Sequence, residues 1–252
     1  MKAKAKEITP QELAGIIRRH PRVVALTGAG ISVASGIPDF RSPGGLWERF
    51  DPMEYAHIEA FYRDPEKVWT MLREMADVIF SAEPSPAHKV LAALESRGLL
   101  NAVITQNVDG LHQVAGNSKV IEYHGNHRRL VCLVCHKRID FRPEAARIKP
   151  FPLCDGCGEP LKPDVVFFGE QIPFLEQISA NQEAKKCKVM IIIGTSGVVY
   201  PAAEIPYAAD SNNATIVEIN LDATPFTSSI ADYFFEGSAS VILPRILEQI
   251  GT

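Results

Sequence analysis

The fold is decided by the stretch Ala25-Leu26-Thr27-Gly28-Ala29-Gly30-Ile31-Ser32-Val33-Ala34-Ser35-Gly36-Ile37-Pro38-Asp39-Phe40-Arg41. The apolar run 23–26 leads into this stretch as a strand, and the chain then turns at two glycines. Because a glycine has no Cβ, Gly28 and Gly30 let backbone approach a ligand closely. Free N–H groups at the start of a following helix would suit a pyrophosphate. A strand, Gly-Ala-Gly and a helix make up half of a dinucleotide-binding fingerprint.

The second half of that fingerprint is absent. A third glycine would fall at Val33, and no acidic residue ends a second strand about twenty residues further on. The stretch therefore predicts a nucleotide site but argues against an ordinary dehydrogenase.

The composition is that of an ordinary globular protein, with 252 residues, 46% hydrophobic and 22% charged. This length suits one large domain or a domain with an insertion. With 26 basic against 30 acidic residues and no long basic block, nucleic acid is disfavoured as the main ligand. No apolar run approaches the roughly 18 residues that span a bilayer. The lysines of 1–11 precede no apolar core, so we expect no signal peptide and a cytoplasmic protein.

Helices and strands alternate along the chain. Thr9, Pro10 and Glu12 predict an N-cap, a first helical position and a capping box at the start of a helix over 10–19. Helical spacing and similar signals predict further helices at 52–82, 87–97, 111–115, 176–186, 202–209 and 238–250. Short apolar runs predict strands at 23–26, 99–105, 120–123, 164–168, 189–193, 216–219 and near Phe234-Phe235. Residues 42–51, rich in Gly and Pro, indicate a loop anchored by Trp47. The alternation predicts an α/β fold with a parallel sheet covered on both faces.

Small or polar residues follow several of the predicted strands, namely Gly28, Gln106-Asn107-Val108-Asp109, His124, Gly194-Thr195-Ser196 and Asn220. In open α/β sheets, ligands bind beyond the carboxyl ends of the strands. We therefore expect these residues to gather along one edge and to form the site.

Each of these groups also has a structural interpretation. Asn107 and Asp109 are common turn formers. Asp39 and Arg41 can form a surface ion pair of little energetic value. The segment Phe168-Gly169-Glu170 can be a simple strand exit.

The cysteines point to a metal site. Cys132 and Cys135 form one Cys-x-x-Cys pair, and Cys154 and Cys157 form a second after 18 intervening residues. Two such pairs supply four thiolates to one ion, which predicts a closed structural zinc site in an insertion with little core of its own. Unligated core cysteines or a redox pair are the alternatives, and Cys187 is expected to be a core thiol.

Among the seven histidines, His124 follows a predicted strand and precedes a glycine. An imidazole at the ligand-bearing edge can act as a base near neutral pH, although spacing alone leaves that role open. We expect packed or solvated structural roles for His20, His57, His127 and His136.

Taken in order, these segments resemble the sirtuins, the NAD-dependent protein-lysine deacylases. The motifs that carry the resemblance are Gly28-Ala29-Gly30-Ile31-Ser32, Gly36-Ile37-Pro38-Asp39-Phe40-Arg41, Thr105-Gln106-Asn107-Val108-Asp109-Gly110-Leu111-His112, His124-Gly125, the four paired cysteines, Phe167-Phe168-Gly169-Glu170, Gly194-Thr195-Ser196 and Asn220. The resemblance accounts for the incomplete fingerprint, because sirtuins bind NAD differently from dehydrogenases.

The resemblance implies a Rossmann-like NAD-binding domain made of 1–41, 85–126 and 164–252. A helical insertion at 42–84 and a zinc-ribbon insertion at 127–163 would together form a small domain. NAD and an acyl-lysine peptide would enter the cleft between the domains from opposite sides. Apart from the resemblance, we expect the protein to be a monomer.

The family pattern also implies site residues. Those that would border NAD are Gly28, Ala29, Gly30, Ile31, Pro38, Asp39, Phe40, Arg41, Trp47, Gln106, Asn107, Val108, Asp109, Gly194, Thr195, Ser196, Asn220, Leu221, Asp222 and Ala239. Those that would hold the peptide as an added strand are Val166, Phe167, Phe168, Gly169, Glu170 and Val198. Within the first set, Asp39 and Val108 would lie near the nicotinamide carboxamide. Gln106, Asn107 and Asp109 would serve the nicotinamide ribose and its pocket.

The implied reaction is not simple hydrolysis. The acyl oxygen of the lysine amide attacks C1′ of the ribose as nicotinamide leaves, which gives an alkylamidate. A neutral His124 then takes a proton from a ribose hydroxyl, and that hydroxyl attacks the amidate carbon. Water completes the release of lysine and O-acyl-ADP-ribose. Asn107 and Asp109 would hold the geometry, and zinc would take no chemical part.

One departure from the family concerns acyl specificity. Members that prefer succinyl- or malonyl-lysine carry a Tyr-x-x-Arg pair in the helical insertion, and the matching positions here are Leu72 and Met75. Without a cation or phenol an acidic acyl group would be poorly paired, so we expect acetyl or a longer neutral chain.

Other functions are compatible with the same residues. A mono-ADP-ribosyltransferase would use the same site with a protein side chain as acceptor. A nucleotide-sensing module would bind NAD without turnover. An oxidoreductase is disfavoured by the missing third glycine.

Overall fold

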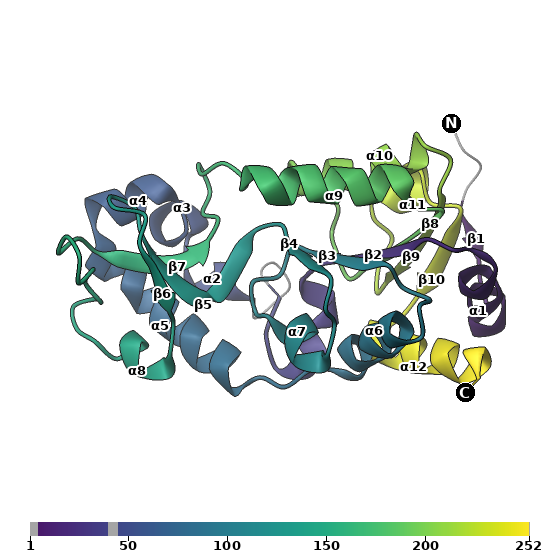
Figure 1. The fold of residues 1–252 in the computed structure, drawn as a ribbon, viewed down its shortest axis with the longest axis horizontal. Helices are drawn as coiled ribbons and strands as arrows, with labels where there is room; N and C mark the ends of the chain where they lie inside the picture. The colour runs from purple at the N-terminus through teal and green to yellow at the C-terminus, as the bar shows by residue number, and fades with distance from the viewer. Residues whose placement is uncertain (1–4, 40–44, 252) are drawn as a thin grey trace.

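The structure, a computed structural model, describes residues 5–39 and 45–251. Its larger part is built on a seven-stranded sheet in the order β1-β10-β9-β8-β2-β3-β4, in which every neighbouring pair is parallel (Figure 1). These strands are β1 Lys6–Glu7, β2 Val23–Thr27, β3 Ala102–Thr105, β4 Val120–Glu122, β8 Val189–Ile193, β9 Thr215–Asn220 and β10 Tyr233–Glu236. The predicted parallel α/β sheet is confirmed.

Helices cover both faces of this sheet (Figure 1). The helices on one face are α1 Pro10–Arg19, α6 Pro86–Ser96 and α12 Ala239–Ile250, and those on the other are α9 Phe174–Lys186, α10 Ile205–Asp210 and α11 Pro225–Ser229. Successive side chains of a strand point to opposite faces. Ala25 of β2 accordingly packs in the hydrophobic core under α1, α6 and α12, whereas Val24 and Leu26 pack in the core under α9, α10 and α11. The central strands β2 and β8 are therefore almost entirely apolar, as expected for strands buried on both sides.

The first helix shows how local sequence sets an element. Thr9 is the N-cap of α1, and its hydroxyl accepts a hydrogen bond from the N–H of Glu12 at 3.2 Å. The Glu12 carboxylate accepts the N–H of Thr9 at 2.9 Å in return. This capping box and Pro10 in the first turn were predicted, and such a cap contributes about 1 kcal/mol.

A three-stranded antiparallel sheet in the order β6-β5-β7 forms the smaller part. Its strands are β5 Gly125–Cys132, β6 Arg138–Asp140 and β7 Leu161–Val165, and the helices around it are α2 Leu46–Arg49, α3 Pro52–Tyr55, α4 Ile58–Arg63, α5 Pro65–Ser81 and α8 Pro143–Ala146. Trp69 of α5 is fully buried in this core, and its indole N–H donates to the carbonyl of Leu161 at 2.9 Å. This bond ties the helical segment to the cysteine-bearing one.

Two element predictions are wrong. The strand expected at 164–168 is β7, which begins at Leu161, ends at Val165 and belongs to the small antiparallel sheet. Pro163 lies within it, which is tolerated because β7 is an edge strand. The helix expected after the glycine loop is replaced by two 3₁₀ turns, Ala29–Ile31 and Val33–Ser35. Glycine, serine and valine are poor helix formers, and Gly36, with φ +83°, ends the second turn.

Smaller differences concern bounds. The strand expected at 99–105 begins only at Ala102, β1 was not expected, and α2 lies in a segment predicted as a loop. The helix α7, Leu111–Ala115, and the strand β8 have the predicted bounds.

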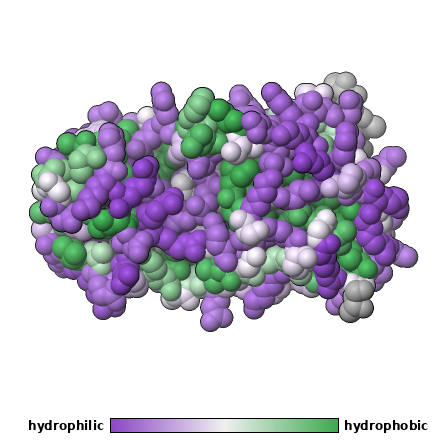
Figure 2. Space-filling view, viewed as in Figure 1, coloured by the Kyte–Doolittle hydropathy of each residue, from purple (hydrophilic) through white to green (hydrophobic). Residues whose placement is uncertain are grey.

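The surface in view is mostly hydrophilic, with a hydrophobic patch over the beginning of α9 (Figure 2). Phe174 and Leu175 are each 71% exposed there. Across 5–39 and 45–251, no helix is long and apolar enough to cross a membrane.

Candidate active site

A cavity of about 690 Å³ lies along the carboxyl edge of the large sheet. The cavity is bordered by residues at or just after the ends of five of the sheet's parallel strands, namely Gly28 after β2, Gln106 after β3, Gly194 after β8, Asn220 at the end of β9 and Gly237 after β10. Its size is that of a small-molecule site. The predicted convergence of the strand ends is therefore present.

Most of the predicted site residues border this cavity. They are Gly28, Ala29, Gly30, Asp39, Trp47, Gln106, Asn107, Val108, His124, Val166, Phe167, Phe168, Gly169, Glu170, Gly194, Thr195, Ser196, Asn220, Leu221, Asp222 and Ala239. Four others, Ile31, Pro38, Asp109 and Val198, are not among its lining residues. Phe40 and Arg41 lie outside the described residues. The roles expected for all of these residues stay predictions.

The glycines of the opening stretch allow two loops to pack against each other. A Cβ on Gly28 would lie 2.7 Å from the carbonyl oxygen of Gly194 and 2.8 Å from Cβ of Thr195. A Cβ on Gly30 would lie 2.7 Å from Cα of Gly194. Real Cβ atoms do not approach backbone so closely. The glycines are thus required by contact between the loops after β2 and β8.

The N–H groups of this loop are largely occupied, which corrects the expectation of free donors. Gly28 donates to the carbonyl of Ile193 at 3.0 Å, and Gly30 donates to that of Gly194 at 2.9 Å. The N–H of Ala29, in contrast, makes no hydrogen bond with any described residue. Among Gly28, Ala29 and Gly30, Ala29 is therefore the residue whose N–H remains for a ligand.

Asn107 and Asp109 support the same loop from the end of β3. The Asn107 amide donates to the carbonyl of Gly28 and to the hydroxyl of Ser32, both at 3.0 Å. The Ser32 hydroxyl donates to Asp109 at 2.7 Å, and the other Asp109 oxygen accepts the N–H of Leu111 at 2.8 Å. Asp109 thus holds the loop by accepting the hydrogen bond from Ser32. Both residues lie in the quoted motifs, but the sequence did not predict their contact.

Gln106 links three strand ends. Its amide donates to the Thr195 hydroxyl at 2.9 Å, and Asn220 donates to the Thr195 carbonyl at 2.9 Å. The Gln106 carbonyl lies 3.1 Å from Nδ1 of His124. These bonds hold residues at the ends of β3, β4, β8 and β9 in one network.

His124 is set up as a neutral base. Nδ1 can bond a carbonyl only if it carries the proton, and that tautomer leaves the lone pair on Nε2. Burial lowers the pKa of His124 below its usual 6.5, and the bond to the Gln106 carbonyl opposes that shift. The imidazole is therefore uncharged at neutral pH.

The 165–170 segment, which follows β7, forms a second wall of the cavity. Val166 donates its N–H to the carbonyl of His124 at 2.8 Å. Gly169 has φ +86°, and a Cβ there would lie 2.9 Å from the His57 ring. His57 also caps α4, because its Nδ1 accepts the N–H of Glu59 at 3.2 Å. Its structural role was expected.

A third wall of the cavity is apolar. It includes Met71, Leu72 and Met75 of α5 together with Ala56, and the polar ring of His127 also borders the cavity. Other lining residues that the sequence reasoning missed are Val33, Ala34, Val165, Ile172, Val199, Tyr200, Pro201, Ile219, Ala223, Thr224, Pro225, Gly237 and Ser238. The rule that ligands bind at strand ends identifies Gly237 and Ser238, which follow β10.

Three histidines are buried near the site. His127 is fully buried, and neither of its ring nitrogens has a partner among the described residues. Burial lowers the pKa of His127 to about 4, that of His88 to about 4 and that of His112 to about 3. His88 and His112 are in edge-to-face contact at 4.7 Å, and His112 Nε2 lies 3.0 Å from the Thr27 hydroxyl. All three are therefore neutral at pH 7.

The four paired cysteines meet in one cluster. All of their sulfurs lie within 4.8 Å of one another, with Cys132 and Cys157 at 3.4 Å and Cys135 and Cys154 at 3.5 Å. Tetrahedral zinc with bonds of about 2.3 Å requires sulfurs about 3.8 Å apart, so the donor set fits. Cys187 is a buried core thiol, as expected, and burial raises its pKa to about 12.

The fold and the cavity together define a class, namely a Rossmann-like α/β protein with a cavity at the carboxyl ends of its strands and a four-cysteine insert. The sequence model of the Sir2 family matches residues 28–201. The chain therefore belongs to the Sir2 family, which is the resemblance identified in the sequence.

Similar proteins include an NAD-dependent protein deacylase of Pyrococcus furiosus, 46% identical over 95% of this chain and 97% of the relative. An NAD-dependent protein deacetylase of Thermodesulfovibrio yellowstonii is 46% identical over 93% of each chain. Among solved structures, a Sir2 homolog–NAD complex superposes with a TM-score of 0.92 at 41% identity, covering 98% of this chain and 96% of the other. A Sir2 complex with a deacetylated p53 peptide and 3′-O-acetyl ADP-ribose has a TM-score of 0.90 at 37% identity, covering 96% and 98%.

Proposed function

We propose that this chain is an NAD-dependent protein-lysine deacylase that acts on acetyl-lysine peptides. Acyl-lysine, NAD and water would give lysine, O-acyl-ADP-ribose and nicotinamide. The observation that carries the proposal is the position of His124. Its side chain bonds to Gln106 in the strand-end network, and its main chain bonds to Val166 in the second wall. One base thus lies between the strand-end residues, where the nucleotide would bind, and the 165–170 segment, where the peptide would bind, in the same cavity.

The nucleotide would lie along the strand ends. Ala29 would offer its N–H to the phosphates. The side-chain nitrogen of Asn107 donates to Gly28 and Ser32, so its side-chain oxygen would be available to the nicotinamide ribose. NAD supplies the C1′ centre to which the acyl oxygen becomes attached. His124, neutral with its lone pair on Nε2, would accept the proton of a ribose hydroxyl.

The experiment is nicotinamide release measured with NAD and an acetyl-lysine peptide. We expect release that requires the peptide, and loss of O-acetyl-ADP-ribose in His124→Ala. Adenine-labelled NAD tests the alternative: label that stays on protein indicates mono-ADP-ribosyl transfer. Binding of NAD with no nicotinamide released would indicate a sensing module.

We propose a preference for neutral acyl groups, acetyl or longer. Leu72 and Met75 border the cavity one helical turn apart on α5, and neither can pair an acyl carboxylate. The apolar wall of Met71, Leu72 and Met75 instead offers burial to methylenes.

We also propose that Cys132, Cys135, Cys154 and Cys157 hold a structural zinc ion, and that 42–84 and 127–163 form a small domain. The shared core of α4, α5, β5 and β7 supports that division. A monomeric state, a cytoplasmic location and the absence of nucleic-acid binding stay predictions.

A further inference from the structure

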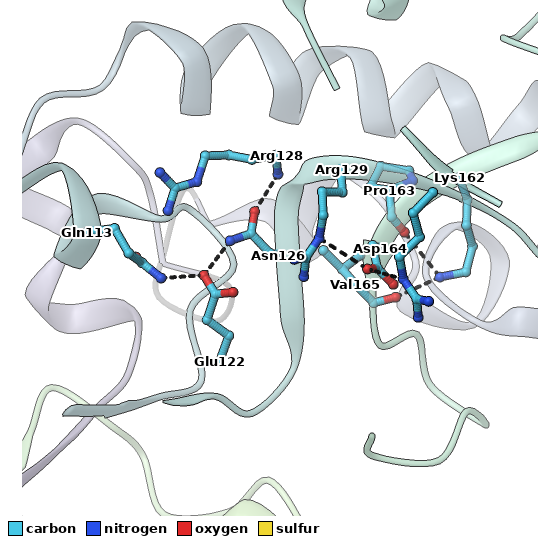
Figure 3. A network of polar contacts seen from close by, with 10 residues as sticks. Gln113, Glu122, Asn126, Arg128, Arg129, Lys162, Pro163, Asp164 and Val165 are labelled. Atoms are coloured by element: carbon cyan, nitrogen blue, oxygen red, sulfur yellow. Dashed lines mark hydrogen bonds and ion pairs between the residues drawn. The ribbon is translucent and has the colours of Figure 1, made fainter. Parts of the chain in front are cut away.

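Lys162 of β7 is a charged side chain in the interior, with 2% of its side chain exposed. A lysine is almost never fully buried unless its ammonium group is paired. Here Nζ donates to the carbonyl of Val165 at 2.6 Å and to that of Pro163 at 3.2 Å (Figure 3). It also lies 3.1 Å from the Glu170 carboxylate. The ammonium group therefore has a full set of partners, and all of them lie in 163–170.

Glu170 completes the arrangement. The same carboxylate oxygen that faces Lys162 accepts the N–H of Phe167 at 2.8 Å, and the N–H of Glu170 donates to the carbonyl of Phe167 at 3.0 Å. The ammonium group of Lys162 lies 4.5 Å from the centre of the Phe167 ring, a cation–π distance. The ion pair thus closes a turn of the chain around Phe167.

These bonds decide which main-chain groups the 165–170 segment can offer. Phe168 pairs with the carbonyl of Ala56 and the N–H of Ile58, and Val166 gives its N–H to His124. With the Val165 carbonyl and both main-chain groups of Phe167 also engaged, the carbonyls of Val166 and Glu170 and both main-chain groups of Gly169 make no hydrogen bond with any described residue. Residues 165–170 line the cavity, so those groups are the ones left for an added strand.

We propose that the Lys162–Glu170 ion pair, whose lysine is buried and whose glutamate side chain is 22% exposed, is a positioning element for the acyl-peptide substrate, which selects the main-chain groups that the peptide can bind. The proposal rests on the deacylase function proposed above. Without the ammonium group, the carbonyl of Val165 becomes a competing acceptor and the hold of Glu170 on Phe167 loosens. The peptide would then have no single register in which to pair with the main chain of 165–170.

The test compares Lys162→Met, Glu170→Gln and the double variant Lys162→Met/Glu170→Gln with the parent enzyme. KM is measured separately for an acetyl-lysine peptide and for NAD, alongside thermal unfolding. Lys119→Met is the matched control, because it breaks a lysine–glutamate pair to Glu183 that is half exposed and away from the cavity. We expect KM for the peptide to rise about tenfold or more in Lys162→Met and KM for NAD to change less than twofold.

The double variant separates positioning from folding. Removing one partner of a buried pair leaves an uncompensated charge, whereas removing both does not. We therefore expect the double variant to recover much of the Tm that Lys162→Met loses while its peptide KM stays high. Recovery of both, or a parallel rise of both KM values, would overturn the proposal. If the parent enzyme itself releases no nicotinamide with the peptide, the deacylase function fails instead.

Discussion

A Cβ atom on Gly30 would lie 2.7 Å from Cα of Gly194, and one on Gly194 would lie 2.7 Å from Cα of Gly30. The loops after β2 and β8 are therefore packed backbone to backbone, joined by the bond from Gly30 to the Gly194 carbonyl. This contact brings Ala29 and Thr195 to the same cavity. By packing against each other, the two glycines fix the positions of Ala29 and Thr195 in the cavity wall.

Gly194→Ala tests this contact. Gly194 has φ +58°, so alanine adds backbone strain as well as the clash, and we expect a loss of about 1–3 kcal/mol in unfolding free energy with weaker NAD binding. Gly15→Ala is the control, because Gly15 lies in α1 and its Cβ would meet only the flexible end of Arg19. That change should stabilise by about 0.5–1 kcal/mol. Equal effects of the two substitutions would contradict the account.

The pH dependence of turnover follows from His124. Because its pKa lies below 6.5, the base is neutral above that value and becomes protonated only as the pH falls further. We expect the acid limb of kcat/KM to lie below pH 6.5, and His124→Ala to lose about 10²–10⁴-fold in product formation. An acid limb above pH 6.5, or an unchanged limb in a variant that is still active, would show that another group is the base.

The buried histidines predict a pH dependence of stability. His127 has a pKa of about 4 in the folded chain and about 6.5 when unfolded, so between these values the unfolded chain binds the extra proton. The contribution of neutral His127 to the unfolding free energy is therefore fully present above pH 6.5 and is lost as the pH falls toward about 4. His88 and His112 act in the same direction.

His127→Phe isolates one of these contributions. It removes two unpartnered buried ring nitrogens, so we expect Tm at pH 7 to rise by about 2–4 °C. Unfolding free energy measured from pH 7 to 4.5 should also fall less steeply than in the parent. A slope equal to that of the parent would refute the assignment.

Metal removal should act on one part of the molecule. Cys132 and Cys154 share a core with Trp69. A chelator should therefore lower Tm and shift tryptophan emission to the red, while far-UV circular dichroism keeps most of the large sheet's signal. Metal analysis should give one zinc per chain, and Cys157→Ser should abolish it. A chain that holds no metal, or keeps its Tm without it, would contradict the site.

Acyl specificity can be redirected if the α5 wall contacts the acyl group. The double variant Leu72→Tyr/Met75→Arg places a phenol and a guanidinium one helical turn apart in the wall. We expect the ratio of succinyl to acetyl removal to rise at least about tenfold, since an Arg–carboxylate pair is bidentate and charge-assisted. The parent should favour acetyl over succinyl at matched concentrations, and the reverse order would overturn the preference.

The sequence predicts much of this molecule because the signals are local. The capping box of Thr9 and Glu12 and the run Val189–Ile193 act within a few residues and are found where predicted. The cysteine cluster was predictable because paired thiols have few other uses.

What could not be predicted depends on contacts distant in sequence. The periodicity of apolar residues predicts neither the contact between Gly30 and Gly194 nor the ion pair between Lys162 and Glu170. His127 reaches the cavity on a strand whose register shifts between Asn126 and Leu130, so the alternation that would have indicated its direction is broken there.

The central claim is tested most directly by product stoichiometry, measured by mass spectrometry after incubation of the parent enzyme with NAD and an acetyl-lysine peptide. The account predicts equal amounts of nicotinamide, deacetylated peptide and O-acetyl-ADP-ribose, and at least about 10²-fold slower formation of the acetylated sugar by His124→Ala. Free acetate without nicotinamide release, or ADP-ribose attached to the peptide, would contradict it.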